Sequence, residues 1–320
     1  MKKVWIDTDP GIDDALAIAM LLESPEIDIV GISSIFGNAT IEHTTRNAAL
    51  FVESAGLTRI PFAKGAALPL NIPLDTSPFV HGVNGLGDMP LTEPDLKPVS
   101  ISAAEAIVAA IRKNPGEITL FPIGPLTNIA LALRLDPSIT ALVKEVVIMG
   151  GAVHVPGNIT PVAEANFFHD PHAARVVLNA DWPVTIAGLD VCGERSMIPH
   201  NMLDAIAHSS NPLAPYIEGA MPHYLNFIAQ YGFTDKSDFP DALAAAYLLD
   251  EAIFEIESIP LYIETEGPCM GQSVPVRAGK WYQNLTDERF FSANASISSV
   301  NVLLNEDGTR FLKFIEDLLV

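Results

Sequence analysis

Four aspartates lie close together near the start of the chain, in the stretch WIDTDPGIDDALAIAML at residues 5–21. They are Asp7, Asp9, Asp13 and Asp14. Like charges at this spacing repel one another, so a fold should avoid them unless a positive group lies among them. Carboxylate oxygens suit hard divalent cations such as Ca²⁺ or Mg²⁺, and no set of histidines and cysteines competes for a softer metal. The spacing therefore predicts a divalent-cation site.

Part of this cluster also has a purely structural interpretation. Pro10 and Gly11 form a turn after the first apolar run, and Asp13 and Asp14 then fall in the first turn of a helix, where the helix dipole favours negative charge. Asp9 falls at the end of the preceding strand, which offers no such dipole. A bound cation would remove the repulsion and lower the pKa of a bound water, whose proton an aspartate could then accept.

The elements that must position these residues follow from the apolar pattern. Short β-branched runs predict strands at 4–9, 27–38, 118–124, 145–151 and 183–190. Longer helical stretches follow them at 13–25, 44–56, 125–133, 170–180 and 199–207. Repeated strand–helix units with apolar strands indicate an α/β fold, with a mostly parallel central sheet and helices on both faces.

The polar residues fall where such a fold binds its ligands. In parallel sheets the active site lies beyond the carboxyl ends of the strands. Asp9, Asn38, Gly124 and Met149 each end or follow a predicted strand, so we expect them to line one rim. We expect a single domain over residues 1–320, with flap loops near 75–90 and 222–241.

The composition excludes several functional classes. The net charge of −21, with only 18 Lys and Arg, argues against nucleic acid as a partner. Cys192 and Cys269 form neither a zinc spacing nor a disulfide framework, which is typical of reduced thiols. No apolar run reaches membrane-spanning length, and the N-terminus is too short in apolar residues for a signal peptide. We therefore expect a cytoplasmic protein without a membrane partner.

Two types of metal-dependent enzyme place Asp-x-Asp after a strand. One is the Mg²⁺-dependent phosphohydrolase that uses an aspartate nucleophile, here Asp7. That type has Thr or Val two positions after the second aspartate, a later lysine and a late acidic pair. Here Gly11 occupies the first of these positions, and the acidic pair follows at once. This type remains an alternative, but the sequence departs from its pattern.

The second type agrees better. The stretch DTDPGIDDALAI at 7–18 closely resembles the signature of the inosine–uridine preferring nucleoside hydrolases. Further segments match that family in order: FGN at 36–38, HGVNGLGD at 81–88, LFPIGPLTNIA at 120–130, EVVIMGGA at 145–152, PGNITPVAEANFFHDPHAA at 156–174 and PDALAAAY at 240–247. The resemblance covers most of the chain. The first motif and the GN…AE-x-N block are its specific parts.

This resemblance implies a function and a site. The family hydrolyses the N-glycosidic bond of ribonucleosides to free base and ribose, with Ca²⁺ gripping the 2′- and 3′-hydroxyls. The implied metal ligands are Asp9, Asp14, the backbone carbonyl of Ile123, and Asp241, and Asp9 is also the implied base that deprotonates the attacking water. The implied substrate-binding residues are Asp13, Asn38, His81, Met149, Asn158, Glu164, Asn166 and Tyr224. The family commonly forms homodimers or homotetramers.

One position departs from the family. Many purine-cleaving relatives carry a histidine directly before the late metal aspartate, and it protonates the leaving base. Here that position is Pro240, which can donate no proton.

Several explanations of Pro240 remain open. Another group could serve as the acid, the candidates being His81, His223 and Tyr224. Alternatively, stacking on Phe167, Tyr231 or Phe233 could raise the affinity of the base for a proton. The substrate could instead be another ribosyl compound with a better leaving group, or the chain could bind ribosyl compounds without turnover.

Overall fold

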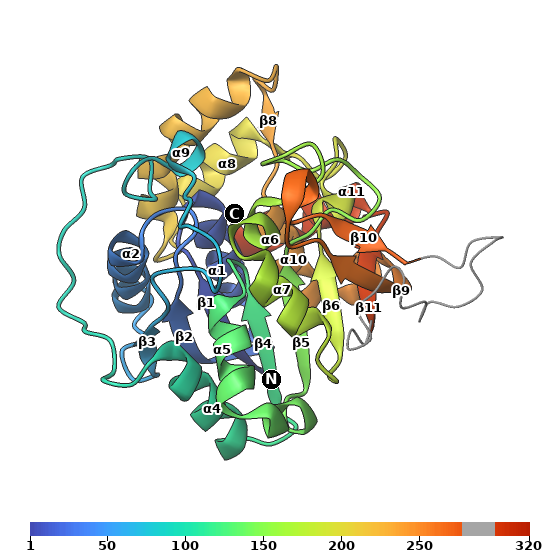
Figure 1. Cartoon of the computed structure of the whole chain (residues 1–320). Helices are drawn as coiled ribbons and strands as arrows, with labels where there is room; N and C mark the ends of the chain where they lie inside the picture. The colour runs from blue at the N-terminus through green and yellow to red at the C-terminus, as the bar shows by residue number, and fades with distance from the viewer. Residues whose placement is uncertain (277–297) are drawn as a thin grey trace.

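A single large sheet organises the chain. The computed structural model describes residues 1–276 and 298–320, and within them nine strands form one sheet in the order β10-β9-β11-β6-β5-β4-β1-β2-β3 (Figure 1). Their bounds are β1 Lys2–Thr8, β2 Ile27–Ser34, β3 Phe62–Lys64, β4 Ile118–Pro122, β5 Glu145–Met149, β6 Val184–Ala187, β9 Glu255–Ile263, β10 Ser273–Pro275 and β11 Ser299–Leu304. The strands from β3 to β11 in this order pair in parallel, and β9 and β10 add an antiparallel edge.

The helices follow the predicted alternation. Their bounds are α1 Ile12–Glu23, α2 Ile41–Ser54, α3 Pro78–His81, α4 Ala103–Lys113, α5 Thr127–Leu135, α6 Ala165–His169, α7 Pro171–Leu178, α8 His200–Ala207, α9 Ala214–Ala229, α10 Pro240–Leu249 and α11 Gly308–Leu319. Two further short strands, β7 Ile198–Pro199 and β8 Lys236–Ser237, pair with each other in antiparallel fashion. In the part of the chain that the structure describes, no helix is both long and apolar enough to cross a membrane.

Both faces of the sheet are covered, as predicted. Successive side chains of a strand point to opposite faces, so Val4 and Ile6 of β1 enter one core while Trp5 enters the other. The core on the Val4 side contains residues of α1, α9, α10 and α11, and the core on the Trp5 side contains residues of α4, α5 and α7. Figure 1 shows α5 and α7 in front of the sheet. The predicted α/β fold with a mostly parallel sheet is confirmed.

The strand order creates a crevice beside β1. From β1 the chain moves outward through β2 to β3, and it then returns to β4 on the other side of β1 and continues to β5 and β6. At such a reversal the connecting helices diverge to opposite faces, and ligands bind in the gap beyond the strand ends. Asp9 follows β1 at this point, and Ile123 and Gly124 follow β4. The Ile123 N–H donates to the Asp7 carbonyl at 2.9 Å, which keeps the two strand ends together.

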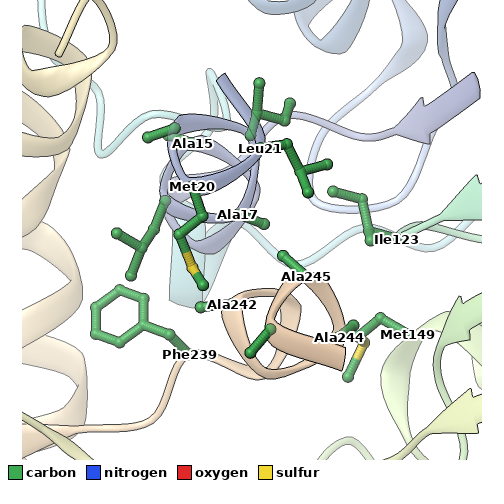
Figure 2. Close-up of a cluster of buried hydrophobic side chains, with 14 of the residues drawn as sticks. Ala15, Ala17, Met20, Leu21, Ile123, Met149, Phe239, Ala242, Ala244 and Ala245 are labelled. Carbon is green, nitrogen blue, oxygen red and sulfur yellow. The ribbon is translucent and has the colours of Figure 1, made fainter. Parts of the chain in front are cut away.

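Helices α1 and α10 pack closely against each other. In Figure 2, Ala17 and Met20 of α1 face Ala242 and Ala245 of α10. All four side chains are buried, and small side chains at the contact let two helix axes approach closely. Since both helices begin at the crevice, this packing brings their first turns, which carry Asp14 and Asp241, together.

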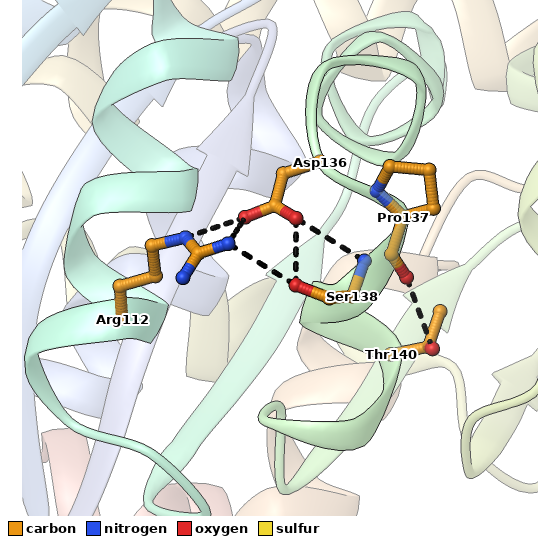
Figure 3. A network of polar contacts seen from close by, with 5 residues as sticks. All are labelled: Arg112, Asp136, Pro137, Ser138 and Thr140. Atoms are coloured by element: carbon orange, nitrogen blue, oxygen red, sulfur yellow. Dashed lines mark hydrogen bonds and ion pairs between the residues drawn. The ribbon is translucent and has the colours of Figure 1, made fainter.

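A network of hydrogen bonds and one ion pair joins surface segments on the other face of the sheet, where α4 and α5 pack. Arg112 of α4 pairs with Asp136 at 2.5 Å and also donates to Ser138 at 3.1 Å (Figure 3). Asp136 in turn accepts the Ser138 N–H at 3.2 Å and so caps the short 3-10 helix Pro137–Ala141. This network joins α4 to the segment between α5 and β5, on the opposite face of the sheet from α10.

The two expected flap segments have different structures. Within 75–90 only α3 is regular, whereas 222–229 forms the last half of α9 and is followed by turns and by β8. That these two segments act as flaps, and that residues 1–320 form one domain, stay predictions.

The α1–α10 contact leads to a stability prediction. We expect Ala245→Leu to lower the free energy of unfolding by about 1–3 kcal/mol, because added methylenes do not fit a packed core. Urea denaturation with an unchanged m-value would measure this loss. Ala109→Leu, at an exposed position of α4, is the matched control and should change the unfolding midpoint little. Equal effects of the two substitutions would contradict close packing at Ala245.

Candidate active site

Carboxylates from two helices converge at the crevice. One oxygen each from Asp13, Asp14 and Asp241 lies within 4.8 Å of the other two, and Asp14 and Asp241 are buried. Asp9, at the end of β1, is 1% exposed, and its charge acts on those of Asp14 and Asp241. The group of three carboxylates contains Asp14 and Asp241, which the sequence analysis assigned to the metal, and Asp13, which it assigned to the substrate. The role of Asp9 as a ligand stays a prediction.

Asp14 and Asp9 are oriented by their neighbours. Asp14 Oδ2 accepts the Gly11 N–H at 2.9 Å and the Asn38 amide at 3.0 Å, and its Oδ1 accepts the Thr8 hydroxyl. Asp9 Oδ2 accepts the Asn38 N–H at 2.7 Å. Asp9 Oδ1 is buried and has no hydrogen-bond partner in the structure. Buried polar atoms are normally paired, so this oxygen is suited to a ligand such as a cation.

The pKa values of these carboxyls show the cost of the cluster. Burial, together with the neighbouring carboxylates, raises the pKa of Asp9 and of Asp241 well above the usual range. Burial raises the pKa of Asp13 to about 6 and, with the charge of Asp13, the pKa of Asp14 to about 7. Ionised carboxylates are unfavourable here without a counter-charge. An all-oxygen set with one orphaned buried oxygen therefore fits a hard divalent cation.

Two glycines enclose Asp9. A Cβ atom on Gly37 would lie 2.0 Å from Asp9 Oδ2, and one on Gly124 would lie 2.4 Å from Asp9 Oδ1. No side chain fits at either position without moving the carboxylate. The segment FGN at 36–38 and the glycine after β4 therefore fix where the Asp9 oxygens lie.

Asp7 lies behind the cluster and not in it. It is completely buried, and one of its oxygens accepts the Ser33 hydroxyl and the Asn128 amide, the latter at 2.8 Å. Burial raises its pKa to about 7. A phosphohydrolase of the aspartyl-phosphate type needs this carboxylate to attack a phosphate, and an enclosed side chain held by two donors offers no such access. The geometry does not support that alternative.

The second predicted block lies across the crevice. Asn166 donates its amide to the carbonyls of Ile123 and Met149, both at 3.2 Å. Glu164 caps α6, because its oxygens accept the N–H groups of Asn166 at 2.8 Å and of Phe167 at 3.2 Å, and it also accepts the Gly151 N–H at 2.9 Å. Asn158 Oδ1 accepts a backbone N–H at 3.0 Å. These side chains thus shape their own loop, but they also face the cavity described next.

A cavity of about 230 Å³ lies above the carboxylates. Its lining includes these predicted residues: Asp13, Asn38, His81, Ile123, Met149, Asn158, Glu164, Asn166, Tyr224 and Asp241. Asp9 and Asp14 do not line it. The sequence analysis did not anticipate several other lining residues, which are Ser77, Phe79, Leu189, Cys192, Phe227 and Asp238. The sequence did contain a clue to Asp238. It precedes Pro240 by two positions, and in an extended segment residues two apart point the same way.

The candidate proton donors differ in their environment. The Tyr224 hydroxyl donates to the Asp238 carbonyl at 2.6 Å, and burial raises its pKa well above the usual range. His81 is buried, its Nδ1 lies 2.6 Å from where a Gly11 Cβ would be, and burial lowers its pKa to about 4. His223 does not line the cavity.

The candidate stacking rings do not line the cavity either. Phe167 is fully buried and packs against Gly150 and Gly151, which is a core position. Tyr231 is 67% exposed, and Phe233 is half-buried in the turn after α9. In this arrangement Phe79 and Phe227, whose ring centroids lie 5.9 Å apart, are the aromatic side chains at the cavity besides Tyr224.

Comparison with known proteins decides the family. The model of the inosine-uridine preferring nucleoside hydrolase family matches residues 4–313. The chain belongs to this family.

Individual nucleoside hydrolases support the assignment over the full length. The chain is 37% identical to a probable uridine nucleosidase 2 of Arabidopsis thaliana, and the match covers 100% of this chain and 98% of that protein. It is 37% identical to the inosine-uridine preferring nucleoside hydrolase of Crithidia fasciculata, over 83% of this chain and 84% of that protein. A plant nucleoside hydrolase structure superposes with a TM-score of 0.91 and 31% identity, covering 99% of this chain and 98% of the other.

The glycines around Asp9 give a test of its placement. We expect Gly124→Ala to weaken cation binding and to lower any hydrolytic rate by about 10²-fold, since displacing a catalytic group by about 1 Å costs that much. Calorimetric titration with Ca²⁺ would measure the affinity. Gly193→Ala is the control, because a Cβ there would lie 3.7 Å from Glu306 Oε1, an ordinary van der Waals distance. Unchanged affinity in Gly124→Ala would contradict a role of Asp9 as ligand.

The raised pKa values predict how stability depends on pH without a cation. Carboxyls of the unfolded chain ionise near pH 4, whereas the folded protein keeps protons on Asp13 up to about pH 6 and on Asp7 and Asp14 up to about pH 7. The folded state thus binds more protons in this window, and its free energy of unfolding falls as pH rises.

Thermal unfolding after chelation should show this directly. We expect the midpoint to fall between pH 5 and pH 8 and the fall to be smaller at saturating Ca²⁺, which serves as the control. A chelated protein that becomes more stable over the same range would contradict the prediction.

Proposed function

We propose that this protein hydrolyses the N-glycosidic bond of ribonucleosides to free base and ribose, using Ca²⁺ and a water deprotonated by Asp9. The observation that carries the proposal is the convergence of Asp13, Asp14 and Asp241 beneath one cavity in a member of the nucleoside hydrolase family. The names of the relatives, which include uridine nucleosidases, favour uridine and inosine as the first substrates to test.

The cation would be held by oxygen atoms alone. Its proposed ligands are Asp9, Asp14, the Ile123 carbonyl and Asp241. Ca²⁺ accepts six to eight oxygen ligands, carboxylate and carbonyl alike, in flexible geometry, which suits this mixed set better than the strict octahedron of Mg²⁺. When bound, the cation supplies a Lewis acid that lowers the pKa of water and binds hydroxyl groups.

The remaining roles belong to side chains of the chain itself. Asp9 accepts the proton of the attacking water while the Asn38 N–H holds its other oxygen at 2.7 Å. Asp13, Asn158, Glu164 and Asn166 are proposed to bind the ribose hydroxyls, with Met149 and the rings of His81 and Tyr224 around the substrate. Cleavage develops positive charge on the sugar ring, and the surrounding carboxylates stabilise that charge.

The assembly and location of the protein are further proposals. By resemblance to its family we propose a homodimer or homotetramer, which light scattering on the purified chain would test. The cytoplasmic location predicted from the sequence stays a prediction.

The decisive experiment measures reducing ribose released from a panel of purine and pyrimidine ribonucleosides and from p-nitrophenyl riboside. It is run with Ca²⁺, with Mg²⁺ and after chelation. We expect release that depends on Ca²⁺ and falls by at least about 10²–10⁴-fold in Asp9→Asn, the range for loss of a general base. Asp95→Asn, at an exposed position, is the control.

Other outcomes separate the alternatives. Release from p-nitrophenyl riboside alone would favour a ribosyl substrate with a better leaving group. Ribose-dependent binding without any release would favour a binding protein that has lost turnover, and would contradict the proposed hydrolase. Full activity after chelation would contradict the proposed cation.

A further inference from the structure

The leaving base must receive a proton, and the cavity offers few groups that can give one. A departing base anion is a poor leaving group, and a positioned acid typically adds about 10²–10⁴-fold in rate. Pro240 lines the cavity directly before Asp241 and has no proton to give. The acid therefore has to come from another residue of the lining.

Asp238 has the geometry of such a group. It lines the same cavity as Tyr224 and Pro240, and its Oδ1 is buried without a hydrogen-bond partner in the described structure. A carboxyl oxygen that no protein donor occupies is free to carry a proton toward a ligand. Its backbone carbonyl accepts the Tyr224 hydroxyl at 2.6 Å, which anchors the residue to α9.

The backbone explains why Asp238 and Pro240 share a face. The segment that enters α10 is extended, with β8 at Lys236–Ser237 and Phe239 at φ −138° and ψ 83°. Side chains of an extended chain alternate, so residues two apart point the same way. Ser237 and Phe239 are buried in the protein, whereas Asp238 and Pro240 both line the cavity. The carboxyl thus stands on the same side of the chain as Pro240, two residues earlier.

The surroundings increase the fraction of Asp238 that carries a proton in weakly acidic to neutral solution. Burial, and after it the charge of Glu306, raises the pKa of Asp238 to about 6, while Lys236 acts in the opposite direction. Cys192 and Tyr224 also face it, and burial raises the pKa of both well above their usual ranges, so both are neutral. The charged groups that act on Asp238 are therefore Glu306 and Lys236.

Other lining groups are committed elsewhere. The oxygens of Glu164 accept backbone N–H groups, so this residue acts as a hydrogen-bond acceptor. The Tyr224 hydroxyl already donates to a carbonyl. The remaining competitor is His81, whose Nδ1 points at Gly11 and whose other ring nitrogen could face the cavity.

We propose that Asp238 is the acid that protonates the leaving base, an inference that rests on the proposed nucleoside hydrolysis. As the N-glycosidic bond breaks, its electron pair stays on the base, and the Asp238 carboxyl transfers its proton to a base nitrogen. The water oxygen bonds to the anomeric carbon and its proton passes to Asp9. Asp9 then releases its proton to solvent and Asp238 regains one, so protons and charge balance over one turnover.

The test compares two leaving groups in one variant. In Asp238→Asn we expect kcat for uridine or inosine to fall by about 10²-fold or more, and the rate with p-nitrophenyl riboside, whose leaving group needs no proton, to change by less than about threefold. Wild-type kcat for the nucleoside should decline as pH rises through the pKa of the acid, and Asp238→Asn should lose that decline. Asp235→Asn, an exposed aspartate in the same segment, is the matched control.

Any of the following results would overturn the proposal. Equal losses with both substrates would mean that Asp238 only supports the structure, and unfolding midpoints of the variants would show it. No loss in Asp238→Asn, together with a nucleoside-selective loss in His81→Asn, would assign the acid to His81. If the wild-type protein cleaves only p-nitrophenyl riboside, the ribose-binding part of the site works, and Asp238 does not act as an acid for nucleosides. Wild-type protein that cleaves neither compound would refute the proposed function itself.

Discussion

The mutual repulsion of buried carboxylates is the constraint on which the rest of this structure depends. Asp9, Asp14 and Asp241 come from a strand end and two helix starts, and each loses solvent when the fold forms. The protein meets part of that cost with hydrogen bonds, such as those from Gly11 and Asn38. The rest is offset by protonation, which the raised pKa values of these carboxyls express, or by a bound counter-charge. The close α1–α10 packing therefore assembles a site that a bound cation would stabilise.

Much of the fold could be predicted from the sequence, because a buried parallel sheet reads as apolar runs separated by helices. The five predicted strands became β1, β2, β4, β5 and β6, and the helices after them formed. The analysis did not predict α4, although Ser102 and Glu105 form a capping box at its start. It also did not predict the antiparallel edge. The first residues of β9 are largely exposed, and β10 has only three residues, so this edge gives no clear apolar run. The strand β3, at the other end of the sheet, also has only three residues.

The site was predictable where a motif carried it and less so elsewhere. The first aspartates were found by their spacing, and Asp241 and the Glu164–Asn166 block by resemblance. Asp13, Asp241, Glu164 and Asn166 line one cavity. The burial of Asp7 and the enclosure of Asp9 by glycines depend on strand register, which the sequence does not display. Asp238 was missed for a similar reason. Its environment depends on Glu306, which is distant in sequence, and on an extended segment that looked like a simple break between helices.

The places in the chain from which the proposed ligands come have a consequence for how the folded chain would come apart. Asp9 and Asp14 precede the first helix or begin it, Ile123 follows the fourth strand, and Asp241 begins the tenth helix. A cation bound to all of them acts as a cross-link between distant parts of one chain and closes long loops that are entropically costly to form. Opening any one of these segments then requires release of the ion. With such a cation bound, local opening at the crevice and global unfolding would both depend on the concentration of free cation.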